Sequence, residues 1–162
     1  MIALDDTDWR LLHLLQQDAA RSNQALAEAA GVSPATALRR VRRLVDTGVI
    51  ERQVALLNPA AVGAGLAALV EVSLDRQGAE HLDAFEARAV AEGAVQQVWR
   101  VSPGPDFVLV VQVADMPAYQ ALAQRLFTQD ANVRNVKAFF SLKRAKFVTA
   151  VPLPVQPSSD PA

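Results

Sequence analysis

The most constraining feature of this sequence is an arginine-rich stretch that runs from Gly31 to Leu44. Ser33 is a favourable helix N-cap and Pro34 suits the first helical position, so a helix is predicted to begin here. At about 100° per residue, its apolar side is predicted to carry Leu38, Val41 and Val45, with Leu44 at the edge. The opposite side carries Thr36, Arg39, Arg40 and Arg43. A short helix with an apolar back and an arginine-rich front fits the major groove of DNA.

The residues before this stretch favour DNA binding over the common alternative, a charged helix face that is merely solvated. Residues 22–30 are predicted to form a short helix that begins at Ser22. Gly31 then ends that helix, and Ser33 starts the next one at once. A helix, a tight glycine turn and an arginine-faced helix together form the pattern of a helix-turn-helix.

The predicted DNA contacts follow from this arrangement. The arginines are expected to contact phosphates and guanine edges, while small residues approach the groove at the N-terminus of the helix. The predicted DNA-binding residues are Ser33, Ala35, Thr36, Arg39, Arg40 and Arg43. A dimer would prefer a nearly palindromic double-stranded site, with half-sites about 34 Å or a multiple of that apart.

Composition restricts the other possibilities. The chain has 162 residues and a formal net charge of −1, so affinity for DNA must come from a local patch and not from a global basic field. The absence of cysteine excludes disulfides and thiolate zinc sites, and no other metal or cofactor site is predicted. No run approaches the roughly 20 apolar residues of a membrane span, and no signal peptide is evident. We therefore expect a cytoplasmic protein with no membrane contact.

The second half of the chain changes periodicity and predicts an α+β domain. Strands are expected over 66–74, 95–101 and 107–113, helices over 79–92 and 116–128, and one or two final strands within 133–151. The order βαββαβ is the ferredoxin-like arrangement, with two helices on one face of a four-stranded antiparallel sheet. Apolar residues that face away from those helices would require a second copy of the chain as cover. The candidates are Trp99, Val108, Val110 and Phe139.

The expected division of the chain is a helix-turn-helix domain at 1–48, a linking segment at 49–65 and a ferredoxin-like domain at 66–151. Within the linking segment, residues 49–57 are predicted to form a strand and residues 60–65 a hinge. The tail at 152–162 is rich in proline and is expected to be disordered.

Five stretches, in order, resemble the Lrp/AsnC family of feast/famine transcription regulators over residues 4–150. They are Leu4-Asp5-Asp6-Thr7-Asp8, the run from Gly31 to Leu44, Gly48-Val49-Ile50, Leu56-Leu57-Asn58-Pro59 and Asp115-Met116-Pro117-Ala118-Tyr119. The resemblance implies a winged helix-turn-helix, a linking strand and a βαββαβ (RAM-type) effector-sensing domain. It also implies dimers or octamers that regulate amino-acid metabolism genes, commonly in response to an amino acid.

One loop departs from the family pattern. The resemblance implies a Gly-Asp-aromatic-Asp turn whose backbone N–H groups help to hold the effector carboxylate. The aligned turn here is Pro103-Gly104-Pro105-Asp106-Phe107, and each proline removes a donor. The effector-binding candidates are Ser102, Gly104, Asp106 and Phe107. A tight turn with no ligand role is the alternative, so an effector and its absence both stay open.

Two further functions are considered beside DNA binding. The sirohaem decarboxylases resemble this family and act on a tetrapyrrole, but such a site needs basic and imidazole side chains in one pocket. This chain has only His13 and His81, one in each predicted domain. No catalytic set is evident, so no enzyme activity is expected. A ligand-binding module of the same fold is the other alternative. The operator, the sign of regulation and the choice between dimer and octamer stay open.

Overall fold

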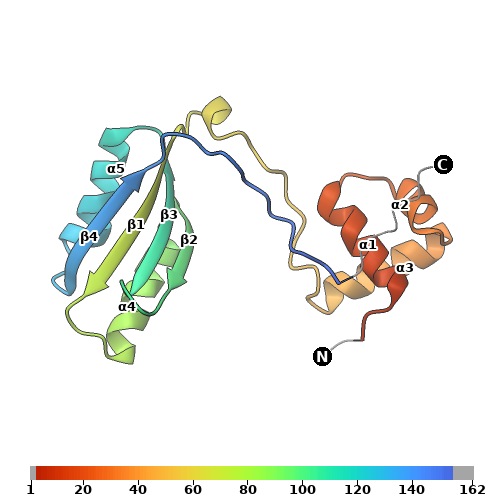
Figure 1. Cartoon of the computed structure of the whole chain (residues 1–162), viewed down its shortest axis with the longest axis horizontal. Coiled ribbons are helices and arrows are strands. Elements are labelled where there is room, and N and C mark those ends of the chain that lie inside the picture. Colours follow the sequence, from red (N-terminus) through yellow and green to blue (C-terminus); the bar gives the residue numbers. More distant parts are fainter. Residues whose placement is uncertain (1–2, 155–162) are drawn as a thin grey trace. The chain divides into compact units, whose positions relative to one another are not determined.

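The computed structural model describes residues 3–154 and divides the chain into two compact units (Figure 1). One unit contains the chain up to Ala55 together with the segment from Lys146, and the other spans Leu56–Ala145. None of the described helices is long and apolar enough to cross a membrane.

The first unit is a bundle of three helices, α1 (Asp6–Gln17), α2 (Asn23–Ala30) and α3 (Pro34–Asp46). Gly31 ends α2 at φ 69°, a left-handed conformation that favours glycine. The three helices bury a small apolar core of Leu11, Leu26, Ala27, Ala30 and Ala37. The described part of this unit contains no strand, so the predicted wing is absent and the domain is a plain trihelical helix-turn-helix.

The C-terminal segment belongs to this helical unit by its contacts. The side-chain amide of Gln16 on α1 donates to the carbonyl of Val151 at 3.2 Å and accepts from the N–H of Val151 at 2.7 Å. Val151, the last residue of the predicted sheet domain, is thus hydrogen-bonded to α1. The predicted disordered tail falls largely on residues 155–162, which lie outside the described residues.

The linking strand predicted over 49–57 is not formed in this structure. Residues 51–57 are exposed and have no strand assignment. A strand requires a hydrogen-bonded neighbour, and no described segment pairs with this one. The predicted hinge contains a short 3₁₀ turn, Ala60–Val62, whose first N–H is capped by the side chain of Asn58 at 3.1 Å.

The second unit confirms the predicted βαββαβ order. Its strands are β1 (Leu66–Leu74), β2 (Val95–Arg100), β3 (Phe107–Val113) and β4 (Val133–Phe140), and its helices are α4 (Ala79–Ala91) and α5 (Met116–Ala123). A π turn, Gln124–Thr128, extends α5. The sheet order is β2-β3-β1-β4 and every pairing is antiparallel. Only one strand, β4, forms within residues 133–151, and it ends at Phe140.

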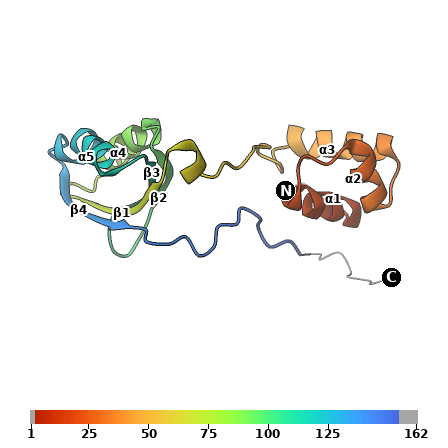
Figure 2. The same ribbon diagram turned by 90° about the horizontal axis from the view of Figure 1, so that it is seen from above.

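Strict alternation divides the sheet into two faces. Alternate residues of β1 and β3 are buried against α4 and α5, and this core includes Phe85, Phe107 and Leu122. Figure 2 shows both helices on the same side of the strands. Within the described part of this unit, no helix covers the other face. The described residues of this unit therefore form the predicted α+β fold, with one layer of helices packed on one sheet.

The uncovered sheet face carries apolar side chains on all four strands. Trp99 and Phe139 are 58% and 54% exposed, and Leu69, which pairs with Phe139, is 50% exposed. Val108 lies opposite Trp99 on the same face. Exposed aromatic and aliphatic side chains gathered on one sheet mark an association surface.

We expect the sheet face to hold a dimer together. Replacing both Trp99 and Phe139 by Glu would place charges in the buried contact, so the full chain should dissociate to a monomer in sedimentation velocity at micromolar concentration. Val90→Glu is the control, since Val90 is 67% exposed on the helical face. A double variant that sediments like the wild type would contradict this assembly.

Candidate nucleic-acid interface

The N-terminus of α3 is fixed by side chains on both sides of the turn. The Ser33 hydroxyl accepts from the N–H of Thr36 at 3.2 Å and donates to the Thr36 hydroxyl at 2.9 Å. The side chain of Asn23 donates to the carbonyl of Pro34 at 2.9 Å and ties α2 to α3. The predicted N-cap and first helical position are thus confirmed, and the helix begins in a defined orientation.

The rotation of α3 differs from the sequence prediction. Ala37 and Leu44 are fully buried and Val41 packs against the core, so the inward side is centred on these residues. Leu38 and Val45 were predicted to face inward, but they are 41% and 45% exposed. The prediction was wrong because the hydrophobic pattern did not account for polar partners that α1 offers to α3.

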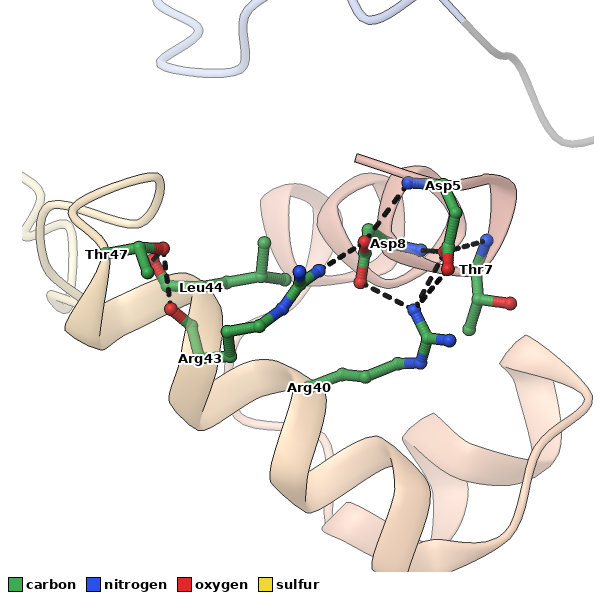
Figure 3. Close-up of polar contacts among 7 residues, drawn as sticks. All are labelled: Asp5, Thr7, Asp8, Arg40, Arg43, Leu44 and Thr47. Atoms are coloured by element: carbon green, nitrogen blue, oxygen red, sulfur yellow. Dashed lines mark hydrogen bonds and ion pairs between the residues drawn. The ribbon is translucent and has the colours of Figure 1, made fainter. Parts of the chain in front are cut away.

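Those partners are two carboxylates at the start of α1. Asp8 is only 1% exposed, and its oxygens lie 3.0 Å from Nη1 of Arg40 and 2.5 Å from Nη2 of Arg43. Asp5 lies 2.7 Å from the same nitrogen of Arg40. Figure 3 shows both guanidinium groups of α3 pointing at these acids. Arg40 and Arg43, both predicted to contact DNA, therefore have protein partners in this structure.

The ion pairs change the protonation behaviour of their members. The hydrogen bond from Arg40 holds the pKa of Asp5 below its ordinary value, and the N–H of Asp8 and nearby positive charge act in the same direction. Hydrogen bonds to Asp5 and Asp8 raise the pKa of Arg40 in turn. Both groups are thus held in their charged forms.

The face of α3 opposite the core carries two other arginines. Arg39 and Arg42 are exposed, and Ala35 lies on the same face one turn earlier. Residues three, four and seven apart share one side of a helix, so these three positions form one stripe. Arg42 was missed in the sequence prediction. Arg42 lies seven residues after Ala35 and three after Arg39, and this helical spacing could have placed it on the same face.

All six predicted contact residues keep accessible surface, and they differ in their partners: Arg43 is exposed and Arg40 partly exposed, but both are paired with acids of α1, whereas the other four are not. Ser33 and Ala35 are exposed at the start of α3, Thr36 is partly exposed beside them, and Arg39 follows on the outer stripe. Contact of any of these residues with DNA stays a prediction.

The predicted effector turn lies between β2 and β3 and is tied to the sheet. The carboxylate of Asp106 accepts from the N–H of Leu74 at 2.7 Å through Oδ2, and the N–H of Asp106 donates to the carbonyl of Val72 at 2.9 Å. Ser102 and Gly104 are exposed, and the peptide bond between Ser102 and Pro103 is cis. One carboxylate oxygen of Asp106 is thus engaged by the backbone of β1, and a role of Asp106 in effector binding stays a prediction.

Phe107 has a structural position that the sequence prediction did not anticipate. Its ring is fully buried in the sheet core, with its centroid 4.8 Å from that of Phe85. A ring enclosed on this face cannot contact a ligand in the exposed part of the turn. Because side chains alternate along β3, Phe107 is buried on one face while its neighbour Val108 is partly exposed on the other.

We expect Phe107→Ala to reduce the free energy of unfolding by about 3–5 kcal/mol, because it leaves a cavity beside Phe85. Chemical denaturation monitored by circular dichroism measures this loss. Ser102→Ala is the control from the same turn, and its effect should stay within about 0.5 kcal/mol. Equal small effects of the two substitutions would contradict the core position of Phe107.

Together these features define a class of protein. A trihelical unit with a helix-turn-helix and an exposed arginine stripe is a DNA-binding unit. The same chain carries a separate α+β unit with an open apolar sheet face. Among the described residues, no group of three His, Asp or Glu side chains could hold a metal ion. The class is a two-domain helix-turn-helix DNA-binding protein.

Comparison with known proteins identifies the family. Residues 4–45 match the AsnC-type helix-turn-helix domain, and residues 67–151 match the Lrp/AsnC ligand binding domain. The chain belongs to the Lrp/AsnC family and is a DNA-binding transcriptional regulator.

Similar proteins span nearly the whole chain. The DNA-binding transcriptional activator DecR of Escherichia coli K12 is 35% identical over 150 residues, which cover 93% of this chain and 99% of that protein. The leucine-responsive regulatory protein of Rhizobium meliloti is 35% identical over 145 residues, with 90% and 93% covered. These relatives are named as transcription regulators and not as enzymes.

Solved structures agree with this assignment. A transcriptional regulator of Neisseria meningitidis, determined as a complex with L-Met, has a TM-score of 0.87 and 30% identity over 94% of this chain and 98% of that one. An AsnC family regulator from Agrobacterium tumefaciens has a TM-score of 0.86 at 30% identity, with 92% and 97% covered.

Proposed function

We propose that this chain binds double-stranded DNA sequence-specifically through the outer stripe of α3 and regulates genes of amino-acid metabolism. The observation that carries the proposal is the exposure of Ala35, Arg39 and Arg42 on the face of α3 opposite its buried residues. A recognition helix inserts such a face into the major groove, with its N-terminal residues nearest the bases.

The two exposed arginines suit two kinds of contact. A guanidinium can bind guanine O6 and N7 in a bidentate manner or can neutralise a phosphate. Ser33 and Thr36 can approach the groove from the helix N-terminus. Arg40 and Arg43 lie on the flank of α3 that faces α1, where their guanidinium groups pair with Asp5 and Asp8, and their contact with DNA stays a prediction.

We expect Arg39→Ala and Arg42→Ala each to weaken binding to a selected operator at matched salt. If the lost contact is to a phosphate, the dependence of log K on log salt should become shallower by about 1. Fluorescence anisotropy over a salt series measures both quantities. Arg10→Ala is the control, because Arg10 lies on α1 and donates to Thr7 at 3.2 Å. Wild-type affinity in both α3 variants would rule out this stripe as the reader.

The sheet unit is the candidate for effector binding. The Neisseria relative was determined with L-Met, and an amino acid or a related small molecule is therefore the class of effector to test here. A carboxylate needs backbone donors, yet Gly104 is the only residue among 103–105 with a non-proline N–H. Losing one hydrogen bond to a charged group costs roughly 1.5–3 kcal/mol, so two losses weaken binding by a factor on the order of 10² or more.

We expect calorimetric titration with the twenty amino acids to show only weak binding by the wild type. The double substitution Pro103→Gly/Pro105→Tyr should strengthen it, because it restores two N–H donors to the turn. Micromolar binding by the wild type that the double substitution does not improve would contradict this account, and the protein would then use another pose or another site.

Two alternatives are less well supported. A sirohaem decarboxylase-like enzyme would need imidazole groups in one pocket, but His13 lies in the helical unit and His81 in the sheet unit. A pure ligand-binding module would leave the exposed arginine stripe without a role. The absence of catalysis and the cytoplasmic location both stay predictions. We predict the cytoplasm because a regulator of transcription acts where the chromosome is.

A further inference from the structure

A buried carboxylate joins the first helix to the recognition helix. Asp8 occupies the third position of α1, where it completes a capping box by accepting the N–H of Asp5 at 3.1 Å. Its two oxygens accept from Arg40 and Arg43 of α3 (Figure 3). Asp8 is the one buried charged residue in the described part of the chain.

This site constrains both the carboxylate and the arginines that pair with it. A carboxylate removed from water must keep its charge partners, because an unpaired buried charge is strongly unfavourable. The capping box leaves the Asp8 side chain little freedom, since one oxygen serves both the Asp5 N–H and Arg43. The two guanidinium groups are thus drawn to a fixed point on α1.

The same contacts divide the four arginines of α3 into two pairs. Arg40 and Arg43 are three residues apart and share the flank that faces α1, while Arg39 and Arg42 share the outer stripe. Phosphate contacts supply affinity without sequence information, and each one adds to the salt dependence of binding. Four free arginines on one helix would favour DNA of any sequence.

We propose that Asp8, with Asp5, holds Arg40 and Arg43 away from the DNA phosphates and thereby sets the specificity of the recognition helix. Asp8 is a positioning residue that acts through the two arginines. This inference rests on the proposed function, since it assumes that α3 enters the groove. It adds that the protein limits its own non-specific affinity with an internal acid.

The test is Asp8→Asn in the full chain, with a random duplex and a selected operator as probes. Asparagine keeps the size of the side chain and the acceptor for the Asp5 N–H, but it removes the charge that holds Arg43, while Arg40 keeps its ion pair with Asp5. The salt dependence of log K should steepen by about 1, because the released Arg43 neutralises one further phosphate. Affinity for the random duplex should rise about tenfold, while the ratio of operator to random binding falls.

Asp6→Asn is the matched control. Asp6 is exposed in the same first turn of α1, and its carboxylate forms no hydrogen bond or ion pair with the described residues. The control removes the same charge without releasing an arginine, so its salt dependence should equal that of the wild type. Equal steepening in both variants would reduce the effect to net charge and overturn the proposal.

A second comparison separates positioning from folding. Arg43→Gln should leave the salt dependence unchanged in the wild-type chain but should reverse the steepening in the Asp8→Asn chain. If a thermal melt shows that Asp8→Asn does not fold, Arg40→Gln and Arg43→Gln are measured in the wild-type chain instead. A dependence of log K on log salt that becomes shallower by about 1 in these variants would show that the arginines already contact phosphates, and it would overturn the proposal.

The outcome also distinguishes this inference from the proposed function. If Arg39→Ala and Arg42→Ala lose affinity while Asp8→Asn binds like the wild type, the positioning role fails and the reading face stands. If neither Arg39→Ala nor Arg42→Ala affects binding, the reading face fails whatever Asp8→Asn does.

Discussion

The pairing of buried Asp8 with Arg40 and Arg43 is the interaction on which the helical unit depends. It closes the flank of α3 that the small apolar core does not cover, and it fixes the rotation of that helix about its axis. Every assignment of the reading face follows from this rotation. With the acids in place, Ala35, Arg39 and Arg42 point outward, and the arginine cluster is divided between a pair that contacts α1 and an outer, exposed pair.

The sheet unit depends on a different constraint, the alternation of side chains along β1 and β3. One face packs against α4 and α5, and the other exposes Leu69, Trp99 and Phe139. An antiparallel sheet with one apolar face uncovered favours association, and a dimer would place two recognition helices on one DNA molecule. The proposed association surface and the proposed DNA-reading surface thus belong to separate units of a single chain.

The effector turn shows how a local change can alter a site within a preserved fold. Asp106 is bonded to the backbone of β1, so the turn keeps its place at the end of the sheet. The two prolines remove N–H donors without disturbing that attachment. Phe107, which the motif alone would assign to a ligand, belongs to the core because the strand period turns it inward.

The sequence by itself determined the order of the elements that form and most of their bounds. Ser33, Pro34 and Gly31 are local signals whose effect on the backbone needs no distant partner, and the alternation in the second half predicts strands in the same way. The tertiary structure decided the features that such local signals cannot specify. The Asp8 ion pairs, the outward position of Leu38 and Val45 and the missing strand over 49–57 all depend on which segment lies alongside. Helical periodicity ranks residues by polarity, but a buried carboxylate on another helix can make an arginine face inward, and only the packed chain brings the two together.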